Sequence, residues 1–488
     1  MSSTVARNTA WLMVATLGQK VVSFLAFYII ARLVGPTVTG KYFYAVSITS
    51  VFVVLADFGL TPVVIRELAA NQERGRAYLA RALQFKVVLL PLAVLASLAY
   101  AWIVRVEPDV FAAVVVACFV LLADSLSLIF YGALRGQRDL RFEAIGMLVC
   151  QLATAIASVL ILRAGGGVIG LVCALLLGSL WNLGWSLVQA WRRKATPIGA
   201  SLISFKSLFL AALPFGLAGL FVKIYSYTDS LLLRQYFGHA SVGQYAVAYK
   251  LTYALQFLPL TFVAALYPAM SSEFASGDHQ GLRRSLKNGL RLMMLAGVPL
   301  SALLSALAKP IILTFYGQPY AGAIAPMMVL PWVLIPIFLD FPVGSLLNAT
   351  RRSSLKTTSM GVTMVINVLL NLVLVPKYGP LGAAYAGVVS FWLLLLLGLW
   401  FARADLPEKG WFASFFLRGL ASAALIWGLM HFVAASFPFI AQLLFGGASS
   451  LLVLFVMRLC LVEDVLMVWG FLRRRAVPPP DANEEANS

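Results

Sequence analysis

Seven charged side chains interrupt long apolar runs of this sequence. They are Lys20, Asp57, Asp124, Lys223, Asp229, Lys250 and Asp340. If these runs cross a membrane, each such charge costs about 2.5–3.5 kcal/mol near the middle of a helix, so it must face a partner or water. Two kinds of chemistry would use such charges. They are ion pairs between helices, and a hydrated cavity that binds a charged ligand or a coupling ion.

The lysines of the second half, Lys223 and Lys250, favour the cavity. Acids at a matching depth are fewer there, and four tyrosines lie nearby in the sequence: Tyr225, Tyr227, Tyr245 and Tyr249. A lysine ammonium is a compact charge that suits a phosphate group. Aromatic faces suit sugar rings or an apolar substrate. We therefore predict that Lys20, Lys223, Lys250, Tyr225 and Tyr249 line a cationic cavity.

The acids leave two interpretations open. Lys20, Asp57 and Asp124 lie at depths that agree to about one helical turn, so Lys20 can pair with either acid and fix helix packing. The alternative is coupling to a gradient of H⁺ or Na⁺. Coupling candidates are Asp57, Asp124, Asp229 and Asp340. We assign Asp57 and Asp124 to packing and favour Asp229 for coupling.

Asn367 and Asn371 lie four residues apart, on one face of a predicted helix. Their amides could bind sugar hydroxyls, and they could equally hold two membrane helices together. Both remain in the predicted binding set.

The sequence offers little for catalysis. His239, His279 and His431 are its only histidines, and they are too scattered for a metal cluster or a catalytic triad. The four cysteines all lie in apolar runs, as buried residues do: Cys118, Cys150, Cys173 and Cys460. No phosphate-binding Gly-rich loop with a Gly-Lys-Ser/Thr ending is present, so ATP is not the direct driver. We expect neither enzymatic activity nor a cofactor or metal.

The amino-acid composition indicates which kind of structural element contains these seven charged residues. Of the 488 residues, 61% are hydrophobic and 11% are charged, and the mean hydropathy is +0.90. A soluble protein of this size could not cover its surface with so few charges. The net charge of +18 lies mostly in short gaps between apolar runs, which argues against a nucleic-acid partner. The sequence therefore predicts an all-α, multi-pass membrane protein.

We count fourteen apolar segments, so both ends of the chain should lie on one side of the membrane. The segments are 8–33, 41–65, 78–103, 110–134, 142–162, 166–190, 207–235, 241–269, 286–308, 321–349, 355–376, 380–402, 411–436 and 440–462. Of the 37 basic residues, 24 lie in the gaps and segment edges on the side of the termini, and 6 on the other side. By the positive-inside rule both termini are cytoplasmic.

Matching glycines indicate an internal repeat. Gly35, Gly40 and Tyr42 match Gly238, Gly243 and Tyr245 at an offset of 203, and Lys20 matches Lys223. Gly167 and Gly170 match Gly379 and Gly382 at an offset of 212. Six segments separate the copies, which predicts two parallel six-helix bundles around a central cavity. Chance similarity among glycine-rich loops is the alternative.

Four regions follow. Residues 1–195 and 196–405 form the two bundles. Residues 406–475 add two helices and a helix from Glu463 to Arg475 on the membrane surface, and residues 476–488 are a disordered cytoplasmic tail.

The ordered set of motifs resembles the Wzx-type polysaccharide flippases of the multidrug/oligosaccharidyl-lipid/polysaccharide exporter superfamily. In the first half these are Asn8-x-x-Trp11, Ala31-Arg32-x-x-Gly35, Gly40-x-Tyr42 and Asp57-Phe58-Gly59-Leu60. In the second half they are Gly243-x-Tyr245, Tyr267-Pro268, Asn367-x-x-x-Asn371 and Tyr378-Gly379-x-x-Gly382. The resemblance covers about residues 5 to 475.

This resemblance implies a flippase in the cytoplasmic (inner) membrane of a bacterium. Such a protein moves undecaprenyl-pyrophosphate-linked oligosaccharide to the outer leaflet by alternating access, for O-antigen, capsule or exopolysaccharide synthesis. H⁺, Na⁺ or the membrane potential would drive it, and a polysaccharide polymerase would be a partner. Lipid II flippases are similar, but their arginine-rich first span is not matched around Lys20. Drug exporters of the superfamily have twelve spans and acidic pockets, and a non-transporting scaffold is a further alternative.

Overall fold

The structure, a computed structural model, describes residues 3–137, 139–197 and 203–459. These residues form helices joined by short turns, and no strand occurs among them. Within these ranges, twelve helices are long and apolar enough to cross a membrane. The predicted all-helical, multi-pass fold is therefore confirmed at this level. The predicted surface helix after Glu463, the tail and Cys460 lie outside the described residues.

The helices cover the predicted segments in chain order, but the first and seventh helices each run through a predicted gap, 34–40 and 236–240. Those of the first half are α1 (Ser3–Asp57), α2 (Leu60–Ala70), α3 (Gln72–Ile103), α4 (Pro108–Gly136), α5 (Arg141–Arg163) and α6 (Gly167–Arg192). The second half has α7 (Phe205–Tyr253), α8 (Phe257–Ala275), α9 (His279–Ala306), α10 (Ala308–Ile311), α11 (Ile324–Val329), α12 (Leu334–Ala349), α13 (Ser353–Tyr378) and α14 (Pro380–Phe401). Two more helices follow, α15 (Lys409–Gly428) and α16 (Phe439–Val456).

The two longest helices, α1 and α7, each fold back on themselves at a glycine. Gly35 has φ 73° and ψ 177°, and Gly238 has φ 76° and ψ −178°. In α1 the Tyr320 hydroxyl donates to the Ala31 carbonyl (3.0 Å) and lies 2.9 Å from Thr39 Oγ1. Ala31 and Thr39 would be about 12 Å apart along a straight helix. In α7 the Tyr245 hydroxyl donates to Asp229 across 16 residues, about 24 Å of straight helix.

The matching glycines adopt matching conformations. Gly35 and Gly238 agree in this way, and so do Gly167, with a φ of 55°, and Gly379, with a φ of 56°. The folded-back ends of α1 and α7 also contact each other reciprocally. A Cβ added to Gly40 would lie 1.7 Å from the His239 carbonyl oxygen, and one added to Gly243 would lie 2.0 Å from the Pro36 carbonyl oxygen. Because residues 36 and 239 also differ by 203, this contact has the symmetry that an internal repeat requires.

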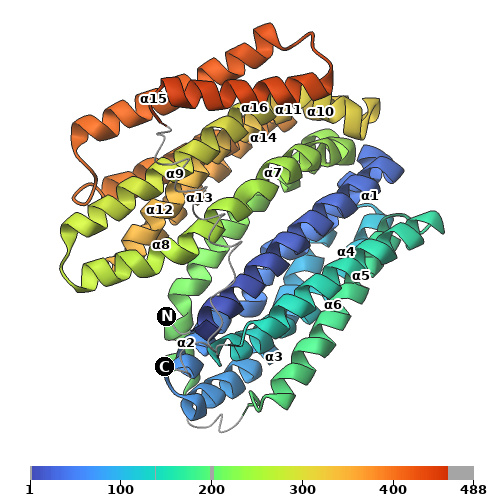
Figure 1. The fold of residues 1–488 in the computed structure, drawn as a ribbon. Coiled ribbons are helices and arrows are strands. Elements are labelled where there is room, and N and C mark those ends of the chain that lie inside the picture. Colours follow the sequence, from blue (N-terminus) through green and yellow to red (C-terminus); the bar gives the residue numbers. More distant parts are fainter. Residues whose placement is uncertain (1–2, 138, 198–202, 460–488) are drawn as a thin grey trace, which may run out of the picture.

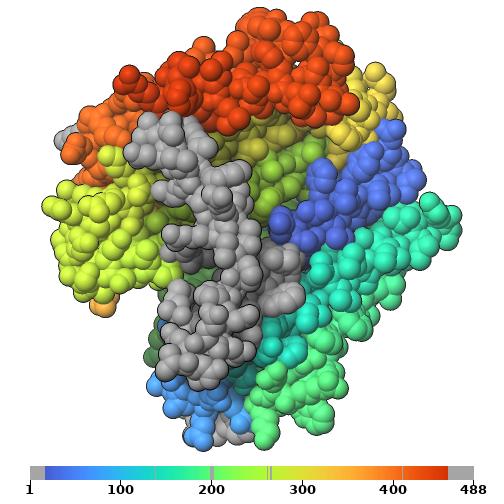
Figure 2. Space-filling model, in the orientation of Figure 1, coloured from blue at the N-terminus to red at the C-terminus, as the bar shows by residue number. Residues whose placement is uncertain are grey.

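The helices form two groups with α1 and α7 side by side between them (Figure 1). Around α1 pack α3, α4, α5 and α6, and around α12 pack α8, α9, α13 and α14. Nearly every described side chain of α12 is buried, as expected for an apolar helix at the centre of a bundle. The last helices, α15 and α16, form a layer over one side of the molecule (Figure 2).

The predicted span over 321–349 is not one regular helix. It consists of a 3₁₀ turn at Gln318–Ala323, then α11, a second 3₁₀ turn at Leu330–Val333, and α12. Each 3₁₀ turn has a proline, Pro319 or Pro331, in its first positions, where a backbone N–H is not needed. Pro91, Pro214 and Pro299 lie inside continuous helices instead.

Candidate functional site

A cavity with two lysines lies between α1 and the part of α7 after Gly238. Lys20 of α1 and Lys250 of α7 both line it, and its volume is 220 Å³. Tyr249 and Tyr253 form part of its wall, and no carboxylate is among its lining residues within the described part of the chain. The structure thus places Lys20, Lys250 and Tyr249 of the predicted set in one cavity.

Helix periodicity explains how α7 presents these side chains. Tyr249 and Tyr253 are four residues apart and stack on one face, with ring centroids 4.2 Å apart and planes 25° apart. The Lys250 ammonium lies 5.6 Å from the ring centre of Phe27 of α1. Neither Lys20 nor Lys250 forms an ion pair with a carboxylate of the described residues. Among the described residues, two cations without a carboxylate partner therefore share a cavity with flat aromatic faces.

Lys223 and Tyr225 lie on the first half of α7 and do not line this cavity. The Lys223 ammonium is 5.4 Å from the ring centre of Tyr227. Tyr225 packs edge-on against Phe391 of α14, with centroids 5.8 Å apart, and Tyr253 packs against the same ring at 5.9 Å. Tyr225 therefore supports the cavity wall through Phe391, while Lys223 is separate from the two cavity lysines.

Asn367 and Asn371 of α13 connect helices. Both are buried, and Asn371 Nδ2 donates to Asn367 Oδ1 at 3.0 Å. Asn367 Nδ2 donates to Ser390 Oγ of α14 at 2.9 Å. This geometry fits the alternative in which the two amides hold α13 against α14.

Asp57 pairs with Lys86 of α3, so the predicted Lys20–Asp57 pair is wrong. Lys86 Nζ lies 3.0 Å from Asp57 Oδ1, and its side chain is 1% exposed. It also donates to the Ala56 carbonyl and to Ser125 of α4. Sequence reasoning missed Lys86, although its depth in the span 78–103 nearly equals that of Asp57 in its own span. This agreement in depth was the feature of the sequence that could have predicted the pair of Asp57 with Lys86.

The other acids also lie away from Lys20. Asp124 of α4 is exposed and forms no ion pair with a basic residue of the described ranges, so the predicted Lys20–Asp124 pair is not formed. Asp340 of α12 pairs with Lys356 of α13 at 2.5 Å. This ion pair joins α12 to α13, and sequence reasoning had treated Lys356 only as a basic residue at a span edge.

Asp229 is a buried carboxylate bound by hydroxyl and backbone donors. It is 6% exposed, and it accepts from the Tyr245 hydroxyl at 2.6 Å and the Ser230 N–H at 2.6 Å. The Ser230 hydroxyl adds a bond at 3.1 Å. No lysine or arginine of the described residues pairs with it. The Tyr245 bond joins the two arms of the folded-back α7.

Polar contacts gather at the folded-back ends of α1 and α7. Arg32 of α1 donates to the Phe315 carbonyl at 3.0 Å, and Glu107, between α3 and α4, lies 2.8 Å from His239 Nε2. Arg234 lies 3.3 Å from Glu107. Partial burial acts to raise the pKa of Glu107, but the His239 bond and the Arg234 charge outweigh it and lower the pKa to about 2. Glu107 is therefore a carboxylate that bridges the first half to α7, and sequence reasoning did not identify it.

Comparisons with known proteins agree with this architecture. Residues 5–274 match the family described as polysaccharide biosynthesis protein, which is more than half of the chain, and residues 214–373 match the MatE family. The chain is 21% identical over 386 residues to the probable low-salt glycan biosynthesis flippase Agl15 of Haloferax volcanii, covering 79% of this chain and 81% of that protein.

Two further similarities are to transport proteins with other printed functions. The probable multidrug resistance protein NorM of Rhizobium meliloti is 26% identical over 204 residues, which covers 40% of this chain and 43% of that protein. The solved structure of lipid II flippase MurJ in an inward closed conformation has the same fold. Its TM-score is 0.76 at 16% identity, covering 93% of this chain and 99% of that chain.

Proposed function

We propose that this chain, which belongs to the polysaccharide biosynthesis protein family, is a flippase for undecaprenyl-pyrophosphate-linked oligosaccharide. It moves the head group from the inner to the outer leaflet of the cytoplasmic membrane of a bacterium by alternating access, for cell-surface polysaccharide synthesis. The observation that carries this proposal is the cavity between α1 and α7. There Lys20 and Lys250 face one space with Tyr249 and Tyr253, and no carboxylate of the described part of the chain lines it.

The chemistry of the cavity suits a pyrophosphate with an attached sugar. Two like charges at membrane depth repel each other and are poorly solvated, so an anionic group between them relieves both penalties. Lysine supplies point charges for phosphate oxygens. The stacked Tyr249 and Tyr253 offer aromatic surface for a sugar ring, while the lipid tail stays in the bilayer.

The topology that we propose has fourteen crossings. A straight α1 of 55 residues would be about 80 Å long, against a hydrocarbon core of about 30 Å. The reversals at Gly35 and Gly238 divide α1 and α7 into two crossings each and raise twelve apolar helices to fourteen spans. Both termini are then cytoplasmic. Residues 1–195 and 196–405 are the two moving halves, residues 406–475 an addition to the second, and residues 476–488 a cytoplasmic tail.

Alternating access requires contacts that can break and reform. The contacts at the folded-back ends of α1 and α7 lie on the outer side in this topology. They include Arg32 with Phe315, and Glu107 with His239. They are polar and partly exposed, so they can exchange protein partners for water at modest cost. We propose that they form the outer gate.

We assign coupling to Asp229 and packing to the ion-paired Asp57 and Asp340. A carboxylate that is held by hydroxyl and amide donors alone can take up a proton without leaving a buried cation unpaired. Asp229 meets this condition among the described residues, and its bond to Tyr245 joins the two arms of α7. Uptake of H⁺, or of Na⁺ at the same oxygens, would weaken the bond between Asp229 and Tyr245. The two arms of α7 could then change their positions relative to each other. Asp124 remains a second coupling candidate because it has no ion-pair partner in the described ranges.

Export of a cationic drug is the second candidate, because residues 214–373 match the MatE family and NorM is a relative. The cavity disfavours it, since Lys20 and Lys250 would repel a cation. A lipid II flippase shares the pyrophosphate chemistry and differs in the head group. A polysaccharide polymerase is the expected partner of the oligosaccharide flippase that we favour.

Surface glycan measured in cells tests the proposal. The double variant K20A/K250A should lose most of the cell-surface polysaccharide, and K20R/K250R should keep part of it because the charges survive. Lys309, an exposed lysine of α10 that does not line the cavity, supplies the control K309A. Protein level is measured by immunoblot. Normal surface glycan in K20A/K250A cells at normal protein level would refute the cationic-cavity argument.

A further inference from the structure

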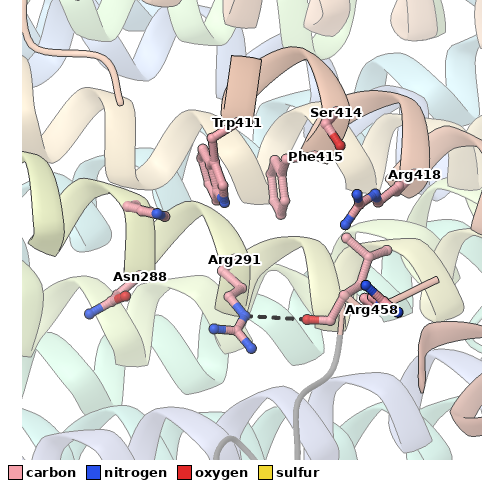
Figure 3. A pocket seen from close by; sticks show the side chains of 9 residues that line it. Asn288, Arg291, Trp411, Ser414, Phe415, Arg418 and Arg458 are labelled. Atoms are coloured by element: carbon pink, nitrogen blue, oxygen red, sulfur yellow. Dashed lines mark hydrogen bonds between the residues drawn. The ribbon is translucent and has the colours of Figure 1, made fainter. Parts of the chain in front are cut away.

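A second cluster of cations lies where α15 and α16 meet α9, in a pocket that shares no lining residue with the cavity of Lys20 and Lys250. Lys287 and Arg291 come from the first half of α9, Arg418 comes from α15, and Arg458 follows α16. They line a pocket of 130 Å³ together with the rings of Trp411 and Phe415. Figure 3 shows Arg418 and Arg291 on two sides of the space beneath Trp411 and Phe415, with a dashed line marking the hydrogen bond of Arg291. Three separate elements therefore bring positive charge to one point.

We infer that this pocket binds the phosphate of an anionic membrane lipid. No carboxylate is among the residues that line it, and neither Lys287, Arg418 nor Arg458 pairs with a carboxylate of the described ranges. The Lys287 ammonium lies 4.8 Å from the ring centre of Trp411. Arg291 donates to the Leu459 carbonyl at 3.3 Å, which ties α9 to the segment after α16. Clustered cations repel one another, so a bound anion would stabilise the junction.

Arginine and tryptophan together indicate where that anion comes from. One guanidinium group can donate two parallel hydrogen bonds to two phosphate oxygens. Trp, Lys and Arg side chains are enriched at the head-group level of a membrane. Apolar side chains that are close in sequence to the pocket arginines are exposed. Leu417, which precedes Arg418, is 68% exposed, and Val456, two residues before Arg458, is 65% exposed. These side chains can contact acyl chains, so the source is a lipid phosphate and not a free phosphate ion.

The backbone at Arg458 provides a clean test. Arg458 has φ 55°, in the left-handed region that favours glycine, and the Leu459 N–H donates to the Leu454 carbonyl in a helix-ending motif. Arg458→Gly therefore removes the charge and suits the backbone. Arg351, which follows α12, has a φ of 60°, and the N–H of the next residue, Arg352, likewise donates to the carbonyl five residues before it. Arg351→Gly is thus a matched change outside the pocket.

The experiment compares R418Q/R458G with the control R284Q/R351G in the full-length protein. Arg284 is exposed and does not line the pocket. Both double variants lose two positive charges, but only R418Q/R458G loses them from the pocket. Thermal unfolding in detergent is followed with added phosphatidylglycerol, phosphatidylcholine or inorganic phosphate, and native mass spectrometry counts bound lipids. Phosphatidylglycerol should raise Tm of the wild type and the control by several degrees more than phosphatidylcholine does. R418Q/R458G should lose most of that difference and one bound lipid.

Two outcomes would overturn the inference. A response of R418Q/R458G to phosphatidylglycerol equal to that of the control would show that the pocket does not hold the lipid. An equal Tm rise from inorganic phosphate at the same phosphorus concentration would exclude a lipid as the preferred source. Neither outcome depends on flipping activity, so the result is independent of the function proposed above.

Discussion

At the scale of single residues, the buried Lys86 is the ion-pair partner of Asp57, in place of the predicted Lys20. The ammonium reaches a carboxylate, two backbone carbonyls and the Ser125 hydroxyl, so its charge and its donors are satisfied inside the first half. A buried pair of this kind is costly to break on one side, because the remaining charge has no partner. We therefore assign this pair to packing. The cavity lysines differ from it because no described carboxylate pairs with them.

A double-mutant cycle checks this assignment. Asp57→Ala should destabilise the protein by about 3–5 kcal/mol, because it leaves Lys86 unpaired. Adding Lys86→Met should restore much of the loss, whereas adding Lys20→Ala should restore none. The measurement is the unfolding midpoint in detergent together with protein level in the membrane. Rescue by Lys20→Ala in place of Lys86→Met would contradict the pairing.

Asp229 should respond differently to mutation. Asn is similar in size. Its Oδ1 can accept from Ser230 while its Nδ2 donates to the Tyr245 hydroxyl oxygen, so Asp229→Asn should leave the protein folded and inserted. Its flipping in proteoliposomes should lose most of the response to an imposed pH or sodium gradient. Asp340→Asn serves as the comparison because Asp340 is ion-paired with Lys356. A wild-type gradient response in Asp229→Asn would exclude Asp229 from coupling.

Residue types and depth along each span predicted some contacts and missed others. Lys20 and Lys250 do share a cavity, because both belong to helices that meet at the centre of the molecule. Lys86 was overlooked because Lys20 was compared with Asp57 and Asp124, although Lys86 lies at nearly the same depth as Asp57. The place of Lys223 could not be predicted, because the rotation of a helix about its axis depends on packing against several neighbours at once.

At the scale of elements, glycine decides how α1 and α7 reverse and pack. Gly35 and Gly238 supply the positive φ of the turns, and Gly40 and Gly243 allow the two hairpins to touch. The sequence predicted separate segments on either side of these glycines, and their spacing predicted the repeat. It did not predict that the span over 321–349 breaks into short turns, since prolines elsewhere in the chain lie inside continuous helices.

Substitution of the contact glycines tests this packing. Gly243→Ala would bring a methyl group 2.0 Å from the Pro36 carbonyl oxygen, a contact made by rigid backbone. We expect it to lower the unfolding midpoint or the amount of folded protein strongly. Gly184→Ala is the control, because nothing lies within 4 Å of the added Cβ and its φ is ordinary. If both variants behaved alike, close contact of the hairpins would not be needed for the fold.

At the scale of the whole molecule, the asymmetry of the basic residues predicts the orientation that the proposed function requires. Reporter fusions after Gly75 and Gly199 should read cytoplasmic, and fusions after Glu107 and His239 should read outside. Gly199 lies outside the described residues, so this result would also locate the connection between the two halves. An outside signal at Gly199 would overturn the span count, the repeat and the direction of transport together.

Transport by the purified protein tests the central claim most directly. The wild-type chain, alone in proteoliposomes, should move a fluorescent polyprenyl-pyrophosphate-linked oligosaccharide between leaflets far faster than protein-free vesicles do. K20A/K250A should lose at least about tenfold in rate, as loss of about 1.4 kcal/mol or more of transition-state binding implies, while K309A keeps the wild-type rate. No movement by a folded wild-type protein, or an unchanged rate in K20A/K250A, would contradict a flippase that binds pyrophosphate between Lys20 and Lys250.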